Sequence, residues 1–226
     1  MNHLIAIETS ADVCSVAGFI RGRRVGHLLT DEPRSHSRVL VPMILELLQK
    51  YLNDRVDCIA VSDGPGSFTG LRIGVSTAKG LAFGRDAKII SVPTLESVAA
   101  GLLRADVKLT SCIVVAPSRK GEVYYGLYER NALGSSHRSR IEKAVTIPEF
   151  ESVVLESPSV PVYQTTLNLT DTAVAVVKPD AIEVGYCALG RLDRKEFEDI
   201  SSFEPYYLKA FHAKKPKQSA LDRLPF

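Results

Sequence analysis

The chain has 226 residues, of which 45% are hydrophobic and 24% charged, and its formal net charge is +2. This composition is typical of a globular protein and excludes a disordered or fibrous chain. The small net charge gives no strong electrostatic footprint for nucleic acid, and no apolar stretch approaches the roughly 20 residues of a membrane span. Because the four cysteines lie far apart and no signal-peptide pattern is present, we expect the protein to be in a reducing compartment, the cytoplasm.

In the first half of the chain, apolar runs are followed first by tight turns and then by helical patterns. We expect strands at 4–7, 13–20, 25–29, 58–62 and 89–92, helices at 37–52 and 71–83, and a further helix capped by Thr94 that runs to about Leu103. Meandering strands followed by crossover units indicate a mixed sheet in an α/β lobe.

The second half starts in a similar way and then weakens. We expect strands at 112–116, 122–128 and near 141–147, a short helix at Pro148 and a helix at 182–192, with short strands at most in 157–180. The prediction is therefore a first lobe at 1–104, a reduced second lobe at 105–208 and a basic tail at 209–226.

A glycine-rich loop, Gly64 to Gly70, lies between a predicted strand and a predicted helix. Backbone amides at such a helix start can hold an anion. The spacing fits neither a dinucleotide fingerprint, which needs glycine where Thr69 stands, nor a P-loop, because Lys79 follows Ala78 and precedes Gly80. A tight connection capped by Ser67 or Thr69 is the simpler interpretation, and an anion site is the alternative.

The predicted helix at 37–52 carries two apolar rows. Their members are Leu40, Ile44, Leu47 and Tyr51, extended by Met43, and Val41, Leu45, Leu48 and Leu52. Together they span roughly 200° of the helix, whereas a core-facing stripe needs about 100°. Either the helix is buried between two elements of this chain, or one row docks against another protein.

The next helix carries small residues at Gly70, Gly74 and Ala78, one every four positions. A glycine inside a helix costs about 1 kcal/mol relative to alanine, which points to close packing or to function. The close neighbour could come from this chain or from a partner. Metal catalysis is poorly supported, because His36 has Leu40 at its i+4 position and no histidine pair shares a helical face.

Several motifs together resemble one family. They are Ile5-Ala6-Ile7-Glu8-Thr9-Ser10, Ser35-His36-Ser37 with Leu40-Val41-Pro42, the run from Gly64 to Gly74 that reads GPGSFTGLRIG, Thr77 to Ala82, Arg119 to Tyr124, and Pro205 to Leu208. They resemble the bacterial TsaB (YeaZ) family, densely over residues 4–100 and sparsely afterwards.

The resemblance implies a two-lobed actin-like ATPase (ribonuclease H-like) fold with mixed sheets. It also implies a non-catalytic scaffold that binds and stabilises the catalytic subunit TsaD and supports the ATPase TsaE. That complex transfers threonylcarbamoyl to the adenosine next to the tRNA anticodon, so tRNA would be contacted indirectly. TsaD holds a metal through a His-x-x-x-His motif, where this chain has His36 and Leu40.

The resemblance places the pairing surface on the helices at 37–52 and 71–83. The residues expected there are Leu40, Met43, Ile44, Leu47, Tyr51, Leu71, Gly74, Val75 and Ala78. Free chains would homodimerise through the same helices. No catalytic residue, metal ligand, tightly bound cofactor or membrane contact is expected.

The alternative is an actin-like ATPase or phosphotransferase that uses Glu8 and the 64–70 loop. ATP or ADP with magnesium, bound at a subunit interface, would meet Glu8, Thr9, Ser10, Gly66, Ser67 and Thr69. Where the family commonly has Asp-Ala-Arg, this chain has Pro117-Ser118-Arg119, which removes a carboxylate and a backbone donor and counts against that alternative. A metallopeptidase is the least favoured reading.

Overall fold

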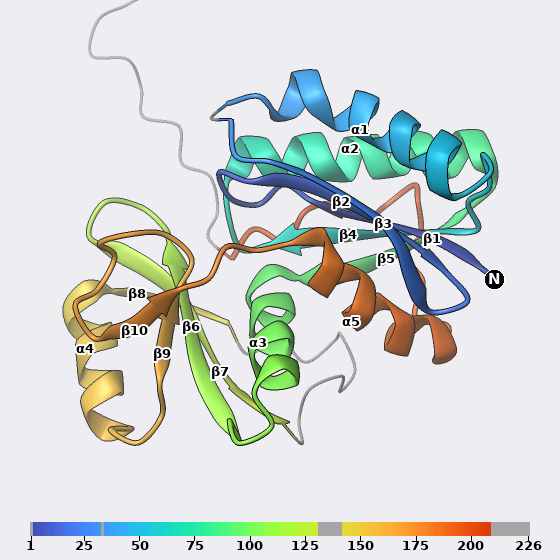
Figure 1. Ribbon diagram of the computed structural model, residues 1–226. Coiled ribbons are helices and arrows are strands. Elements are labelled where there is room, and N and C mark those ends of the chain that lie inside the picture. The colour runs from blue at the N-terminus through green and yellow to red at the C-terminus, as the bar shows by residue number, and fades with distance from the viewer. Residues whose placement is uncertain (1, 33, 131–141, 209–226) are drawn as a thin grey trace, which may run out of the picture.

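The computed structural model describes residues 2–32, 34–130 and 142–208, and the predicted basic tail lies outside them. Two lobes, each with a five-stranded sheet, lie side by side (Figure 1). No helix in the described part of the chain is long and apolar enough to cross a membrane.

The first sheet has the strand order β3-β2-β1-β4-β5, in which β1 is antiparallel to β2 and parallel to β4. Its strands are β1 (His3–Glu8), β2 (Cys14–Ile20), β3 (Arg23–Thr30), β4 (Cys58–Gly64) and β5 (Lys88–Pro93). Side chains alternate between its faces, so Ile5 and Ile7 join the core under one pair of helices while Leu4 and Ala6 join the core on the other side.

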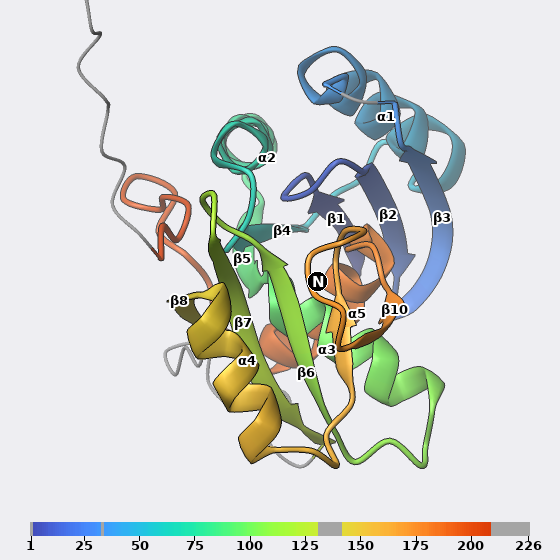
Figure 2. The same ribbon diagram turned by 90° about the vertical axis from the view of Figure 1, so that its left-hand side faces the viewer.

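The helices α1 (His36–Tyr51) and α2 (Phe68–Arg85) lie next to each other on one face of this sheet (Figure 2). The helix α2 begins with a side-chain cap, as the simpler interpretation of the glycine-rich loop predicts: the Ser67 hydroxyl accepts a hydrogen bond from the amide of Gly70 at 3.2 Å. His36 is the first residue of α1, where its Nε2 lies 2.9 Å from the carbonyl oxygen of Ala11.

The second sheet has the order β10-β9-β6-β7-β8 and repeats the topology of the first, strand for strand and direction for direction. Its strands are β6 (Ser111–Pro117), β7 (Glu122–Glu129), β8 (Lys143–Thr146), β9 (Val162–Gln164) and β10 (Ala173–Val176). The helix α4 (Ile147–Glu156) follows β8 as α1 follows β3, and it has a capping box formed by Thr146 and Glu149. No counterpart of α2 stands between β9 and β10, where every residue is described. The second lobe is therefore the smaller repeat.

The two lobes exchange helices: the helix that follows each sheet packs against the sheet of the other lobe. The helix α3 (Thr94–Ala105) follows the first sheet, yet its Leu95 and Val98 pack with Cys112 and Val114 of the second. The helix α5 (Ala181–Asp193) follows the second sheet, yet its Val184 and Ala188 are buried against the first. The range assigned to the second lobe thus contains a helix whose apolar face completes the core of the first.

The predicted cap of α3 is wrong. Thr94 is the first helical residue, Pro93 occupies the N-cap position, and no side chain caps the helix there. The Thr94 hydroxyl is buried without a hydrogen-bond partner. The strand β5 continues to Pro93, which moves the helix boundary by one residue.

Candidate partner surface and interlobe cleft

The end of β1 and the glycine-rich loop pack directly against each other. The amide of Ser67 donates to the carbonyl oxygen of Ser10 at 2.7 Å, and the Thr9 hydroxyl donates to the carbonyl oxygen of Gly70 at 2.9 Å. A Cβ atom at Gly66 would lie 2.4 Å from the Ser10 carbonyl oxygen. Tertiary structure therefore brings together two segments that the sequence separates by more than 50 positions.

Glu8 is completely buried at the end of β1. Its Oε1 accepts a hydrogen bond from the amide of Ser10 at 2.5 Å. Burial raises the pKa of the Glu8 carboxyl above its ordinary value, and hydrogen bonding to Ser10 and Ser62 opposes this shift. Because the carboxyl has no access to solvent, Glu8 does not fit the role of a magnesium ligand.

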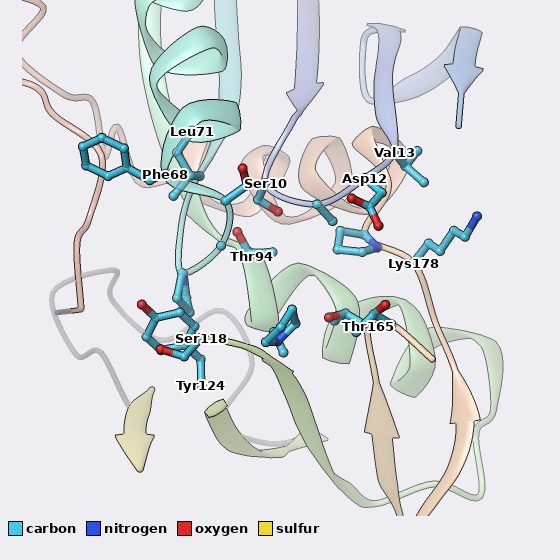
Figure 3. A pocket seen from close by; sticks show the side chains of 18 of the residues that line it. Ser10, Asp12, Val13, Phe68, Leu71, Thr94, Ser118, Tyr124, Thr165 and Lys178 are labelled. Atoms are coloured by element: carbon cyan, nitrogen blue, oxygen red, sulfur yellow. The ribbon is translucent and has the colours of Figure 1, made fainter. Parts of the chain in front are cut away.

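A cavity of about 880 Å³ separates the lobes beside this contact (Figure 3). Its walls include Ser10 from the first lobe, Thr94 from the start of α3 and Ser118 from the second lobe. Aromatic and apolar side chains, among them Phe68 and Leu71, complete the lining. A pocket of this size, mostly apolar with a few polar groups, could hold a small molecule.

The six residues predicted to contact nucleotide divide into two groups. Ser10, Gly66 and Ser67 line the cleft, whereas Glu8, Thr9 and Thr69 do not. The carboxylates in the lining are Asp12 and Asp31, both exposed. Among the residues that the structure describes, no three metal-binding side chains come together. The residues that the structure describes therefore do not form the magnesium site that an actin-like fold implies.

The residues predicted for the partner surface are mostly in the chain's own core. Leu40, Ile44 and Leu47 of α1 are buried against the first sheet, as are Leu71, Gly74, Val75 and Ala78 of α2. Met43 is partly buried on the same core, and Tyr51, although 38% exposed, lies over Gly26 of β3. A partner could reach few of these side chains, so this assignment needs correction.

The exposed apolar positions of the two helices are different ones. Val41 and Leu45 are each 48% exposed and lie one turn apart on α1, and Phe83 of α2 is 83% exposed. A Cβ atom added at Gly80 or Gly84 of α2 would meet no atom within 4 Å, so no contact within the described residues requires glycine there. We call Val41, Leu45, Gly80, Phe83 and Gly84 the outer residues.

Helical periodicity could have identified the outer residues only in part. Val41 and Leu45 belong to the second apolar row, but Leu48 and Leu52 of that row are buried. The buried face of α1 takes in residues from both rows, because α1 packs on the sheet and also beside α2. Gly80, Phe83 and Gly84 have no periodic signal that separates them from core positions.

Two sheets of identical strand order, joined by helices that each cover the opposite sheet, define a two-lobed actin-like ATPase fold. A solved structure from Pseudomonas aeruginosa, described as an uncharacterized protein with similarity to peptidase YEAZ, superposes with a TM-score of 0.76. The two sequences are 26% identical, and the alignment covers 92% of this chain and 100% of that one.

Sequence comparison places the chain more narrowly. The tRNA threonylcarbamoyladenosine biosynthesis protein TsaB of Escherichia coli is 37% identical over 149 residues, 65% of this chain and 63% of that protein. The TsaB of Buchnera aphidicola subsp. Acyrthosiphon pisum is 32% identical over 67% of this chain and 71% of that protein. A family model described as "TsaD: tRNA N6-adenosine threonylcarbamoyltransferase" matches residues 30–159. The chain belongs to the TsaB (YeaZ) family, although its match spans just under two thirds of the Escherichia coli protein.

Proposed function

We propose that this chain is a non-catalytic subunit in the biosynthesis of tRNA threonylcarbamoyladenosine, where it binds and stabilises TsaD and supports TsaE in the cytoplasm. The observation that carries the proposal is the set of outer residues. Val41, Leu45 and Phe83 expose apolar surface on neighbouring helices, and Gly80 and Gly84 would let another helix approach α2 closely.

The family relationships of this chain suggest which protein is its partner. Because a TsaD family model matches residues 30–159, which include both helices, TsaD is expected to present a related helix pair. Two related surfaces can pair about a pseudo-twofold axis, and two copies of this chain can pair about a true one. The same argument supports a homodimer in the absence of TsaD.

The burial of Glu8 supports the proposal that this chain is not catalytic. A carboxyl that is sealed from the cleft cannot organise phosphate or magnesium there. The alternative reading, an ATPase or phosphotransferase, is therefore less well supported. ATP or ADP with magnesium is proposed only as a ligand of the subunit interface, where Ser10, Gly66 and Ser67 would face the nucleotide from the cleft side and the described residues of this chain would not form the magnesium site.

The experiment is size-exclusion chromatography with light scattering on the chain mixed with TsaD of the same organism. We expect a one-to-one complex that is lost in the double variant Leu45→Glu/Phe83→Glu, since both side chains are exposed and their replacement leaves the core intact. The variant Ile44→Glu is unsuitable, because Ile44 is in the core and a buried charge there would unfold the chain.

A matched control is Leu155→Glu, which changes a leucine that is 80% exposed on α4 of the other lobe and should leave the complex intact. Circular dichroism should show the same helix content in every variant. If no complex forms with TsaD, or if the double variant still forms it, the proposed partner surface is wrong.

A further inference from the structure

The turn between β2 and β3 carries three exposed arginines on a rigid support. Ile20 pairs with Arg23, so Arg21 and Gly22 form a two-residue hairpin turn. Both have positive φ, 48° and 77°, the pattern of a type I′ turn. The amide of Arg21 also donates to the carbonyl oxygen of Asn2 at 2.7 Å, which ties the turn to the start of β1.

The charge of this turn is balanced only in part, by an electrostatic interaction of Arg24 with Asp180 at the start of α5. Residues 13–30 contain Arg21, Arg23 and Arg24 and no aspartate or glutamate. Within the described residues, the guanidinium groups of these three arginines make no hydrogen bond or ion pair. By contrast, the exposed Arg38 and Arg194 each pair with a glutamate, Glu32 and Glu196 respectively.

The fold does not require arginine at position 21. A left-handed backbone favours glycine, asparagine or aspartate, and a longer side chain there costs stability. Arg21 occupies such a position while its side chain is exposed. A residue that the turn disfavours and the core does not use is more readily explained by a ligand.

We propose that Arg21, Arg23 and Arg24 bind the phosphate backbone of RNA. This inference rests on the proposed function, because that function supplies the RNA, namely the tRNA held by the complex. Arginine presents a planar fork of donors that matches phosphate oxygens. The turn lies at the end of the first sheet opposite Glu8 and the cleft, and away from α1 and α2 (Figure 1), so a protein seated on the outer residues would leave it exposed.

The test measures tRNA binding as a function of salt, by fluorescence anisotropy, for the chain alone and for its complex with TsaD. Each lost phosphate contact should reduce the slope of log affinity against log salt by about 1. We expect the double variant Arg23→Gln/Arg24→Gln to lower this slope by about 1 to 2 and to weaken binding by roughly tenfold or more at 0.1 M salt. The matched control is Lys108→Gln, which removes an exposed charge after α3.

A second variant separates binding from stability. Arg21→Asn should raise the melting temperature, because asparagine tolerates the left-handed backbone better, and should nevertheless weaken tRNA binding. If the turn had only a structural role, the two quantities would change in the same direction.

The outcomes distinguish this inference from the proposed function. If the TsaD complex forms but the arginine variants bind tRNA with unchanged affinity and slope, the inference is overturned and the proposed function stands. If no TsaD complex forms but the chain alone binds tRNA through these arginines, the inference stands without that function. Equal arginine-dependent binding to phosphatidylserine vesicles, or no measurable tRNA binding in either sample, would overturn the assignment to RNA.

Discussion

Glu8 illustrates how a single residue can suggest catalysis in the sequence and lose that role in the structure. A carboxylate after a buried strand is well placed for magnesium in principle. Here, however, the polypeptide turns immediately, the Ser10 amide occupies Oε1, and no part of Glu8 reaches solvent. Burial therefore favours the neutral acid, and Pro117 of the second lobe supplies no carboxylate for a magnesium site.

We predict that Glu8→Gln stabilises the protein increasingly as the pH rises. The folded-state pKa of Glu8 is raised above its ordinary value of 4.5. The contribution of Glu8 to stability is thus fully present below pH about 4.5 and is lost as the pH rises through the folded-state pKa. Glutamine keeps the acceptor for the Ser10 amide and does not titrate.

The measurement is the free energy of unfolding in urea for wild type and Glu8→Gln at pH 5 and pH 8. The difference between the two proteins should be larger at pH 8. The control is Glu46→Gln on the exposed side of α1, which should show no such dependence. An equal difference for Glu8→Gln at both pH values would mean that Glu8 is ionised in the folded protein.

At the scale of the element, α2 contains glycines of two kinds. A Cβ at Gly70 would lie 2.0 Å from the Thr9 carbonyl oxygen, and one at Gly74 would lie 2.2 Å from the Thr9 hydroxyl. The close neighbour that the small-residue stripe predicted is thus the end of β1 in the same chain. Gly80 and Gly84 meet nothing, and their surroundings leave room for another molecule.

We predict that the same substitution has opposite effects at two positions of this helix. Gly74→Ala should destabilise the chain by about 1–3 kcal/mol, because the new methyl group displaces Thr9. Gly80→Ala should stabilise it by about 0.5–1 kcal/mol, since it removes backbone freedom from the unfolded chain without a clash. Urea denaturation of both variants measures these differences, and the same sign for both would show that packing against Thr9 does not explain Gly74.

At the scale of the whole molecule, α3 and α5 hold the lobes together. Arg191 of α5 is only 1% exposed and donates to both carboxylate oxygens of Glu96 on α3, at 2.9 and 2.8 Å. It also donates to the carbonyl oxygen of Ser91 in β5. The buried Arg191 thus connects α3 and α5 with each other and with strand β5 of the first sheet.

We predict that Glu96→Ala destabilises the protein by about 3–5 kcal/mol, because it leaves Arg191 buried without its counter-ion. The matched control is Glu46→Ala, which removes the partner of Lys50 in an exposed pair of similar length and should change little. The midpoints of urea unfolding compare the two. Equal midpoints for wild type and Glu96→Ala would show that this ion pair does not join the lobes.

The sequence alone determined most of the secondary structure, the two-lobed organisation and the family. These depend on local patterns: buried apolar runs form strands, a 3.6-residue period forms α1 and α2, and the GPGSFTGLR run is specific over a short stretch. The local pattern also narrowed the cap of α2 to Ser67 or Thr69, and the structure shows that it is Ser67.

Which side chains are available to a partner depends on long-range packing. Periodicity shows that α1 has two apolar rows, but the angle at which it crosses the sheet and meets α2 determines that Ile44 is buried and Leu45 exposed. The exchange of α3 and α5 between the lobes, the sealing of Glu8 and the contact of Gly74 with Thr9 all join residues far apart in the chain. Long-range packing of this kind leaves no local periodic signal, because each partner is compatible with many others until the sheet order brings them together.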